Sequence, residues 1–137
     1  MDTKNIRIAA VTDDGTTISA HFGRARYYEV VTVQDGKVAN RERREKAGHH
    51  VFAAHESSEP HGHGPHGFGP DSERKHSQMT DTISDCDMLL ARGMGMGAHT
   101  HLATRGITPI LTTLRTIDEG VAAVIGGTIA DHPERLH

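Results

Sequence analysis

The stretch of sequence that decides the fold reads Asp-Cys-Asp-Met-Leu-Leu-Ala-Arg-Gly-Met-Gly-Met-Gly and occupies residues 85–97. Its apolar part, Asp87 to Ala91, predicts a buried strand, and the glycines behind it predict a turn into a helix over Gly97 to Thr104, closed by Gly106. The next apolar run, Ile107 to Thr112, predicts another buried strand. Strand, helix and strand in this order predict two parallel strands with the helix packed on one face of the sheet.

The chain before this stretch predicts three further strands. Ile6 to Thr12 is a short apolar run that ends at the turn Asp13-Asp14-Gly15. Aromatic and β-branched residues from Tyr27 to Val33 predict a second strand, and Lys37 to Arg43 predicts a third. Asp35-Gly36 between them is a strong hairpin signal, so these two strands are expected to pair antiparallel.

Two more helices are expected on either side of the deciding stretch. One begins at Asp71 or Ser72 and runs to about Ser84, with one face formed by His76, Met79 and Ile83. The other opens with a capping box of Thr116 and Glu119 and ends at Gly126-Gly127. Its core-facing residues are expected to be Ile117, Val121, Val124 and Ile125.

These elements predict one α/β domain over residues 1–137, with three α/β/α layers. The expected order is β-β-β-α-β-α-β-α around a mixed five-stranded sheet, with a flexible His-rich loop at about residues 47–70. The first strand and the last two strands are expected to run parallel, and the second strand to run against them.

Charge and composition narrow the function classes. The chain has 137 residues, a net charge of −3 and one cysteine. The short basic run Arg41, Arg43, Arg44 and Lys46 is interpreted as a solvated strand end, so no nucleic-acid partner is expected. The single Cys86, interpreted as structural, favours a reducing cytoplasm. No apolar run approaches the length of a membrane helix, so no membrane partner is expected.

Histidine is the compositional anomaly. Seven of the 12 histidines lie between His49 and His76. The tract His61, His63 and His66 sits in low-complexity sequence, where flexible imidazoles bind Zn, Ni, Cu and Fe with little selectivity. Composition therefore predicts metal binding.

The predicted strand directions bring several loops to one edge of the sheet. Asp13 follows the first strand, His21-Phe22-Gly23-Arg24 precedes the second, and His49 and His50 follow the third. The glycine-rich turn Arg92 to Gly97 follows the fourth strand and offers backbone N–H groups at a helix N-terminus, where an anion binds favourably. Ligands of open α/β sheets bind at this edge, although glycines can also serve only to make a tight turn.

His99 and His101 follow in the first turns of the predicted helix. Two residues apart, they point in different directions, so at most one is expected to reach the edge. The candidate ligand-binding residues are Asp13, Phe22, Gly23, Arg24, Arg92, Gly93, Met94, Gly95, Met96 and Gly97. The candidate metal ligands are His21, His49, His50, His61, His63, His66, His99 and His101.

Three segments together resemble a known family: Ile8 to Asp14, His21 to Ala25, and Asp85 to Gly95. They are similar to the dinitrogenase iron-molybdenum cofactor biosynthesis family, which contains NifX and the C-terminal domain of NifB. The likeness covers nearly the whole chain outside the His-rich loop. It implies a ribonuclease H-like fold and a non-catalytic carrier of an iron-sulfur or iron-molybdenum cluster, with a protein that donates the cluster and one that accepts it.

Two other functions stay open at this point. The His-rich loop also suits a metal-ion buffer or metal-responsive module that takes a divalent ion such as Zn or Ni. A ribonuclease H-like fold also occurs in nucleases, whose chemistry needs clustered carboxylates. Asp13 and Asp14 are at the proper edge for that chemistry, but the other predicted strands supply histidine, glycine and threonine there.

Overall fold

The computed structural model describes residues 2–46 and 80–136. Its centre is a five-stranded mixed sheet in the order β3-β2-β1-β4-β5. Along the chain the strands are β1 (Ile6–Thr12), β2 (Tyr27–Gln34), β3 (Lys37–Glu45), β4 (Met88–Ala91) and β5 (Thr108–Leu111). All five predicted strands are present, which confirms an α/β fold with a mixed sheet.

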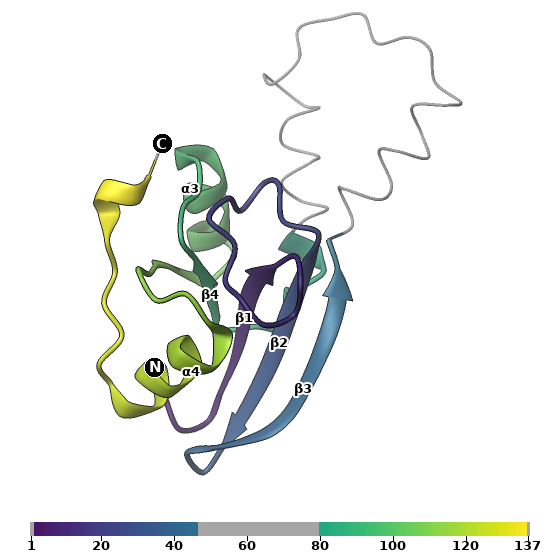
Figure 1. Cartoon of the computed structure of the whole chain (residues 1–137), viewed down its shortest axis with the longest axis vertical. Coiled ribbons are helices and arrows are strands. Elements are labelled where there is room, and N and C mark those ends of the chain that lie inside the picture. Colours follow the sequence, from purple (N-terminus) through teal and green to yellow (C-terminus); the bar gives the residue numbers. More distant parts are fainter. Residues whose placement is uncertain (1, 47–79, 137) are drawn as a thin grey trace, which may run out of the picture.

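Strand directions agree with the sequence prediction. β1 pairs antiparallel with β2 and parallel with β4, and β4 pairs parallel with β5. β1, β3, β4 and β5 therefore all end at the same edge of the sheet, where β2 begins. Figure 1 shows α3 near this edge, and the turn between β2 and β3 at the opposite end.

Local sequence explains the turn of the hairpin. Asp35 and Gly36 both adopt positive φ, at 53° and 76°. This is the conformation of a type I′ turn, whose twist matches that of the flanking strands. The backbone N–H of Gly36 also donates to the carbonyl of Lys4, which ties the turn to the start of β1.

The helices begin and end close to the predicted residues. α3 covers Met96–Thr104 and α4 covers Ile117–Gly126. The capping box of α4 is formed as predicted, with Thr116 accepting from the backbone N–H of Glu119. Gly127 ends α4 in the left-handed conformation, and a short 3-10 helix, η1 (Pro133–Arg135), follows.

Both faces of the sheet are covered. Arg41 of β3 reaches Asp118 at the start of α4, whereas Arg44 of the same strand reaches Asp85. Residues three apart on a strand point to opposite faces, so α4 and the segment 80–85 lie on opposite faces. α3 lies with that segment, because His101 Nε2 is 3.1 Å from the hydroxyl of Thr80.

The helix predicted before β4 ends earlier than expected. Thr80 and Asp81 are helical, but residues 82–85 form a turn, so the predicted end at Ser84 is wrong. The carbonyl of Thr82 accepts from Arg44 and that of Ile83 from the backbone N–H of Cys86, which occupies groups that a longer helix would use. The rest of the predicted helix and the His-rich loop lie outside the described residues. Within the described ranges, no helix is long and apolar enough to cross a membrane.

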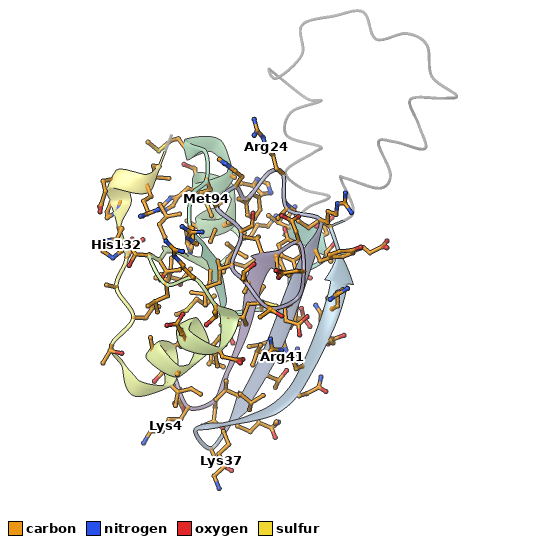
Figure 2. All side chains as sticks on the ribbon, viewed as in Figure 1. Lys4, Arg24, Lys37, Arg41, Met94 and His132 are labelled. Carbon is orange, nitrogen blue, oxygen red and sulfur yellow. The ribbon has the colours of Figure 1, made fainter. Side chains whose placement is uncertain are left out.

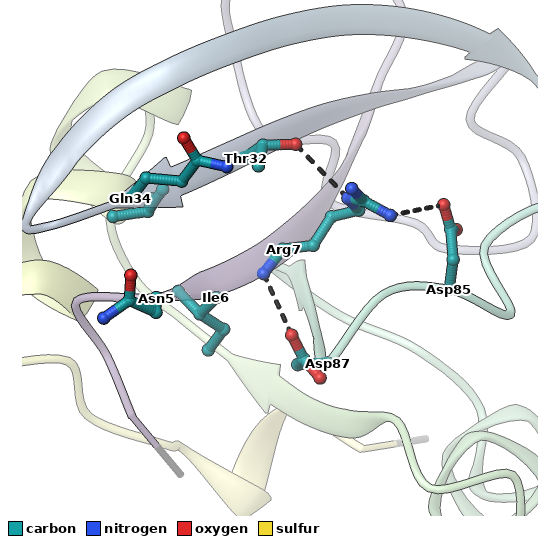
Figure 3. A pocket seen from close by; sticks show the side chains of 8 residues that line it. Asn5, Ile6, Arg7, Thr32, Gln34, Asp85 and Asp87 are labelled. Carbon is teal, nitrogen blue, oxygen red and sulfur yellow. Dashed lines mark hydrogen bonds and ion pairs between the residues drawn. The ribbon is translucent and has the colours of Figure 1, made fainter.

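A network of ion pairs anchors segment 80–85 to the sheet. Asp85 binds Arg7 of β1 at 2.8 Å, and Asp87 accepts from the backbone N–H of Arg7 (Figure 3). Asp85 also binds Arg44 of β3 at 2.7 Å. The guanidinium of Arg44 holds the pKa of Asp85 down at about 2. Arg44 therefore belongs to a tertiary contact, and the interpretation of the whole basic run as solvated is wrong at this residue.

Replacing Arg44 by methionine is expected to lower the free energy of unfolding by about 1 kcal/mol, because charge-assisted hydrogen bonds to Asp85 and to the Thr82 carbonyl are lost. Urea denaturation followed by circular dichroism measures the change. Lys37→Met, at an exposed position in the same strand, is the matched control and should leave stability within experimental error. Equal stability of Arg44→Met and wild type would contradict this account of the anchor.

Candidate functional site

Two loops lie side by side at the edge where β1 and β4 end. One joins β1 to β2, and the other is the glycine-rich turn between β4 and α3. The backbone N–H of Phe22 in the first loop donates to the carbonyl of Gly93 in the second, at 3.0 Å. The backbone N–H of Arg92 donates to the carbonyl of Ser19, also at 3.0 Å. The two loops are thus crosslinked through their backbones.

A cavity of about 370 Å³ lies where these loops meet, lined by His21, Phe22, Gly23, Arg24, Met94 and Gly95. All six were predicted from the sequence, which placed both loops at this edge. His21, Gly23 and Arg24 are exposed, whereas Phe22 and Met94 are buried. Figure 2 shows Arg24 and Met94 at one end of the molecule and Lys4 and Lys37 at the other.

The glycines leave open space at the cavity. Neither Gly23 nor Gly95 would bring an added Cβ within 4 Å of another group. Gly95 is the N-cap of α3, in an extended conformation, and no side chain in the described ranges caps this helix. Considering residues 2–46 and 80–136 alone, the first backbone N–H groups of α3 can serve as donors for a negatively charged ligand.

The charge of the cavity lining is positive or neutral. Arg24 contributes a guanidinium and His21 an imidazole, and the six lining residues include no carboxylate. Asp13 lies nearby, but its Oδ1 accepts the backbone N–H of Arg26 at 2.9 Å. This arrangement favours an anionic ligand over a bare cation.

The carboxylate of Asp14 stabilises the loop after β1. Its carboxylate accepts the backbone N–H groups of Thr16 and Thr17 at 2.8 Å, which lowers its pKa to about 2. Asp13 and Asp14, the two carboxylates that a nuclease would use at this edge, therefore both accept hydrogen bonds from backbone N–H groups. Of the residues that the structure describes, no group of three His, Cys, Asp or Glu side chains is placed to hold a metal ion.

The predicted histidine ligands divide into three groups. His21 lines the cavity, and His99 is half-buried in the first turn of α3. His101 lies against Thr80 on the face of the sheet that segment 80–85 covers. The remaining predicted ligands lie outside the described residues: His49, His50, His61, His63 and His66.

The other predicted residues of the glycine-rich turn differ in exposure. Met96 is 59% exposed, and the exposed Gly97 follows it in α3. Arg92 is half-buried, and its carbonyl accepts from Arg135 near the C-terminus. Gly93 is buried and supplies the carbonyl that binds Phe22.

Lys46 is a neighbour of the cavity that the sequence prediction missed. Its side chain is only 1% exposed, and its ammonium donates to the carbonyl of Phe22. The ammonium also lies 4.4 Å from the ring centre of Phe22 and 5.7 Å from that of Tyr28. Burial lowers the pKa of Lys46 to about 8, although the negative charge of Asp13 acts to raise it. The interpretation of this lysine as part of a solvated strand end is wrong, because its side chain is buried against the Phe22 loop.

Comparison with known protein families decides the relationship. A family model described as dinitrogenase iron-molybdenum cofactor matches residues 4–127. The chain belongs to this family. The match spans both loops of the cavity and every described strand, and it confirms the resemblance seen in the three sequence segments. None of the curated proteins matches the chain significantly.

Solved structures share the fold of this family member. PH0822 superposes with a TM-score of 0.65 at 23% identity, covering 94% of this chain and 98% of the other. The MJ0327 protein of Methanocaldococcus jannaschii gives 0.61 at 11% identity, covering 94% and 96%. The apo form of the orange protein from Desulfovibrio gigas gives 0.60 at 18% identity, covering 94% of each chain. At these identities the likeness concerns the fold alone.

The lowered pKa of Lys46 predicts how the free energy of unfolding changes with pH. Its value in the folded chain, about 8, lies below the ordinary 10.5, so the unfolded chain binds more protons between these two values. The cost of burying the charge is therefore fully present below pH 8 and is relieved as the pH rises toward 10.5. Relative to Lys46→Met, the wild-type free energy of unfolding should rise by up to about 3 kcal/mol over this range.

Urea denaturation of both proteins at several pH values from 7 to 10.5 measures this difference. The comparison with Lys46→Met cancels the titration of Cys86 and Tyr28, whose pKa values are raised by burial and which act in the opposite direction. A stability difference that stays constant with pH would show that Lys46 titrates normally.

Proposed function

We propose that this protein is a non-catalytic carrier of an iron-sulfur or iron-molybdenum cluster, or of a precursor of one, in the assembly of a metal cofactor. The observation that supports this most directly is the cavity between the two crosslinked loops, which combines the His21 imidazole with the Arg24 guanidinium and the N-terminus of α3. The family of the chain favours the same cargo.

The chemical groups at the cavity are of types that bind an anionic cluster. An imidazole is a common ligand of iron, and guanidinium and backbone N–H groups donate hydrogen bonds to cluster sulfides or to acidic groups on a cluster. His21 would ligate the cargo together with His49 or His50, and His99 is a further candidate from α3. A site with so few imidazole ligands would hold its cargo weakly enough to pass it on.

The proposed function also implies partner proteins and a compartment. A carrier needs one protein that donates the cluster and one that accepts it, and the compartment we propose is the cytoplasm. The ribonuclease H-like classification of the fold belongs to the proposal too. Nuclease activity does not, because Asp13 and Asp14 both bind backbone N–H groups at the edge where catalytic metal ions would need carboxylates.

A second candidate is a buffer of divalent metal ions such as Zn or Ni, or a module that responds to them. The observation in its favour is the concentration of seven histidines between His49 and His76. In this function the His-rich segment would bind the metal, and the cavity would have no part in it.

Substituting His21 and His49 together by alanine is expected to abolish binding of a reconstituted cluster, because two of its proposed imidazole ligands are lost. The protein is purified without a tag, a metal-affinity column or oxygen, and is then reconstituted with iron and sulfide. Elemental mass spectrometry and a sulfide assay give the content per chain. His132→Ala is the matched control, since His132 pairs with Glu134 and is not among the residues that line the cavity, so its loss should leave the content unchanged.

Deleting residues 55–67 separates the two candidate functions. A cluster carrier keeps its near-integer content of iron and sulfide after the deletion, because the cavity is intact. A buffer loses most of its zinc or nickel capacity. The carrier proposal fails if the double histidine variant binds the cluster as the wild type does, or if the wild type takes up metal ions without sulfide.

A further inference from the structure

The buried ammonium of Lys46 lies directly behind one wall of the cavity. Its described contacts are the Phe22 carbonyl and the rings of Phe22 and Tyr28. Phe22 itself lines the cavity, between His21 and Gly23. Lys46 thus contacts the loop that carries the candidate ligand His21 and the exposed Arg24.

Phe22 is held on both sides of its backbone. Its N–H donates to the Gly93 carbonyl on the opposite loop, and its carbonyl accepts from Lys46. Lys46 is itself fixed to the start of β2, because its backbone N–H donates to the carbonyl of Arg26 at 3.1 Å. Since the aromatic rings of Phe22 and Tyr28 are only 6.3 Å apart, the loop packs on the sheet around this ammonium.

Burial of this charge does not favour folding. A cation taken out of water loses hydration that one carbonyl and two aromatic rings replace only in part. A methionine of similar length would fill the same space without that loss. The position of Lys46 therefore has its clearest effect on the shape and charge of the cavity wall.

We propose that Lys46 is a positioning residue of the cargo site. Its ammonium fixes the Phe22 peptide, which sets the wall formed by residues 21–24, and it places a buried positive charge behind an anionic cargo. The effect of Lys46 on cluster binding rests on the proposed carrier function. Its effect on the position of the loop does not, because that effect is present in the protein without cargo.

The test compares Lys46→Met with wild type after reconstitution with iron and sulfide without oxygen. The variant is expected to bind the cluster at least about tenfold more weakly, as variants of groups that orient metal ligands commonly do. Its thermal unfolding midpoint at pH 7 should be equal to that of wild type or higher. A lysine with a purely structural role would instead lower the midpoint.

Arg44→Met is the matched control, because Arg44 lies two residues away on β3 and binds Asp85 and Thr82 instead of the loop. It should show the opposite pattern, with a lower unfolding midpoint and unchanged cluster binding. Lys46→Gln, which keeps a hydrogen-bond donor without the charge, should show intermediate binding.

The position of the loop is measured on the protein without cargo, from the amide signals of Phe22 and Gly93 in ¹H–¹⁵N spectra. Both signals should shift in Lys46→Met and stay in place in Arg44→Met. Unchanged signals, unchanged cluster binding or failure of Lys46→Met to fold would each overturn the proposal. If wild type takes up no iron and sulfide, the carrier function fails, and the amide signals still decide whether Lys46 positions the loop.

Discussion

The placement of β1 between β2 and β4 is the constraint on which the rest of the molecule depends. β1 pairs with an antiparallel strand on one side and a parallel strand on the other, and its residues Ile8, Ala9 and Ala10 are completely buried. A parallel neighbour requires a crossover connection, whereas an antiparallel one needs only a loop. Because of these strand directions, the loop from β1 to β2 (residues 13–26) and the turn after β4 emerge at the same edge.

The chemistry of the candidate site follows from that meeting of loops. A strand residue in the middle of this sheet is covered on both faces, but a loop residue at the edge can expose an imidazole or a guanidinium. The backbone hydrogen bonds between Phe22 and Gly93 and between Arg92 and Ser19 then give two loops the fixed spacing of a single unit. The cavity is therefore held by backbone contacts and carries its polar side-chain groups on exposed residues, His21 and Arg24.

Three basic residues in and just after β3 take three different roles. Arg41 reaches α4 on one face of the sheet, Arg44 reaches Asp85 on the other, and Lys46 turns beneath the Phe22 loop. Strand alternation separates the two arginines, and the end of β3 separates the lysine from both. A basic run at the end of an edge strand thus contributes to both layers and to the site, although in sequence it looks like one solvated segment.

Local patterns in the sequence determined the five strands, the hairpin turn at Asp35 and Gly36, the capping box of α4 and the loops that line the cavity. Each of these depends on neighbouring residues: apolar runs, positive φ at a turn, or a side chain that binds backbone three residues away. The motifs His21 to Ala25 and Asp85 to Gly95 also carried the family resemblance.

Tertiary structure alone decided the features that join distant segments. The turn at residues 82–85 depends on Arg44, whose guanidinium binds the carbonyl of Thr82 from 38 residues earlier in the chain. The burial of Lys46 depends on two aromatic rings, Phe22 from the loop between β1 and β2 and Tyr28 from β2. No local pattern contains such contacts, because the free energy of a long side chain depends on the partner that folding brings to it. The sequence therefore located the edge and the loops of the candidate site, and only the packed sheet placed a buried cation behind it.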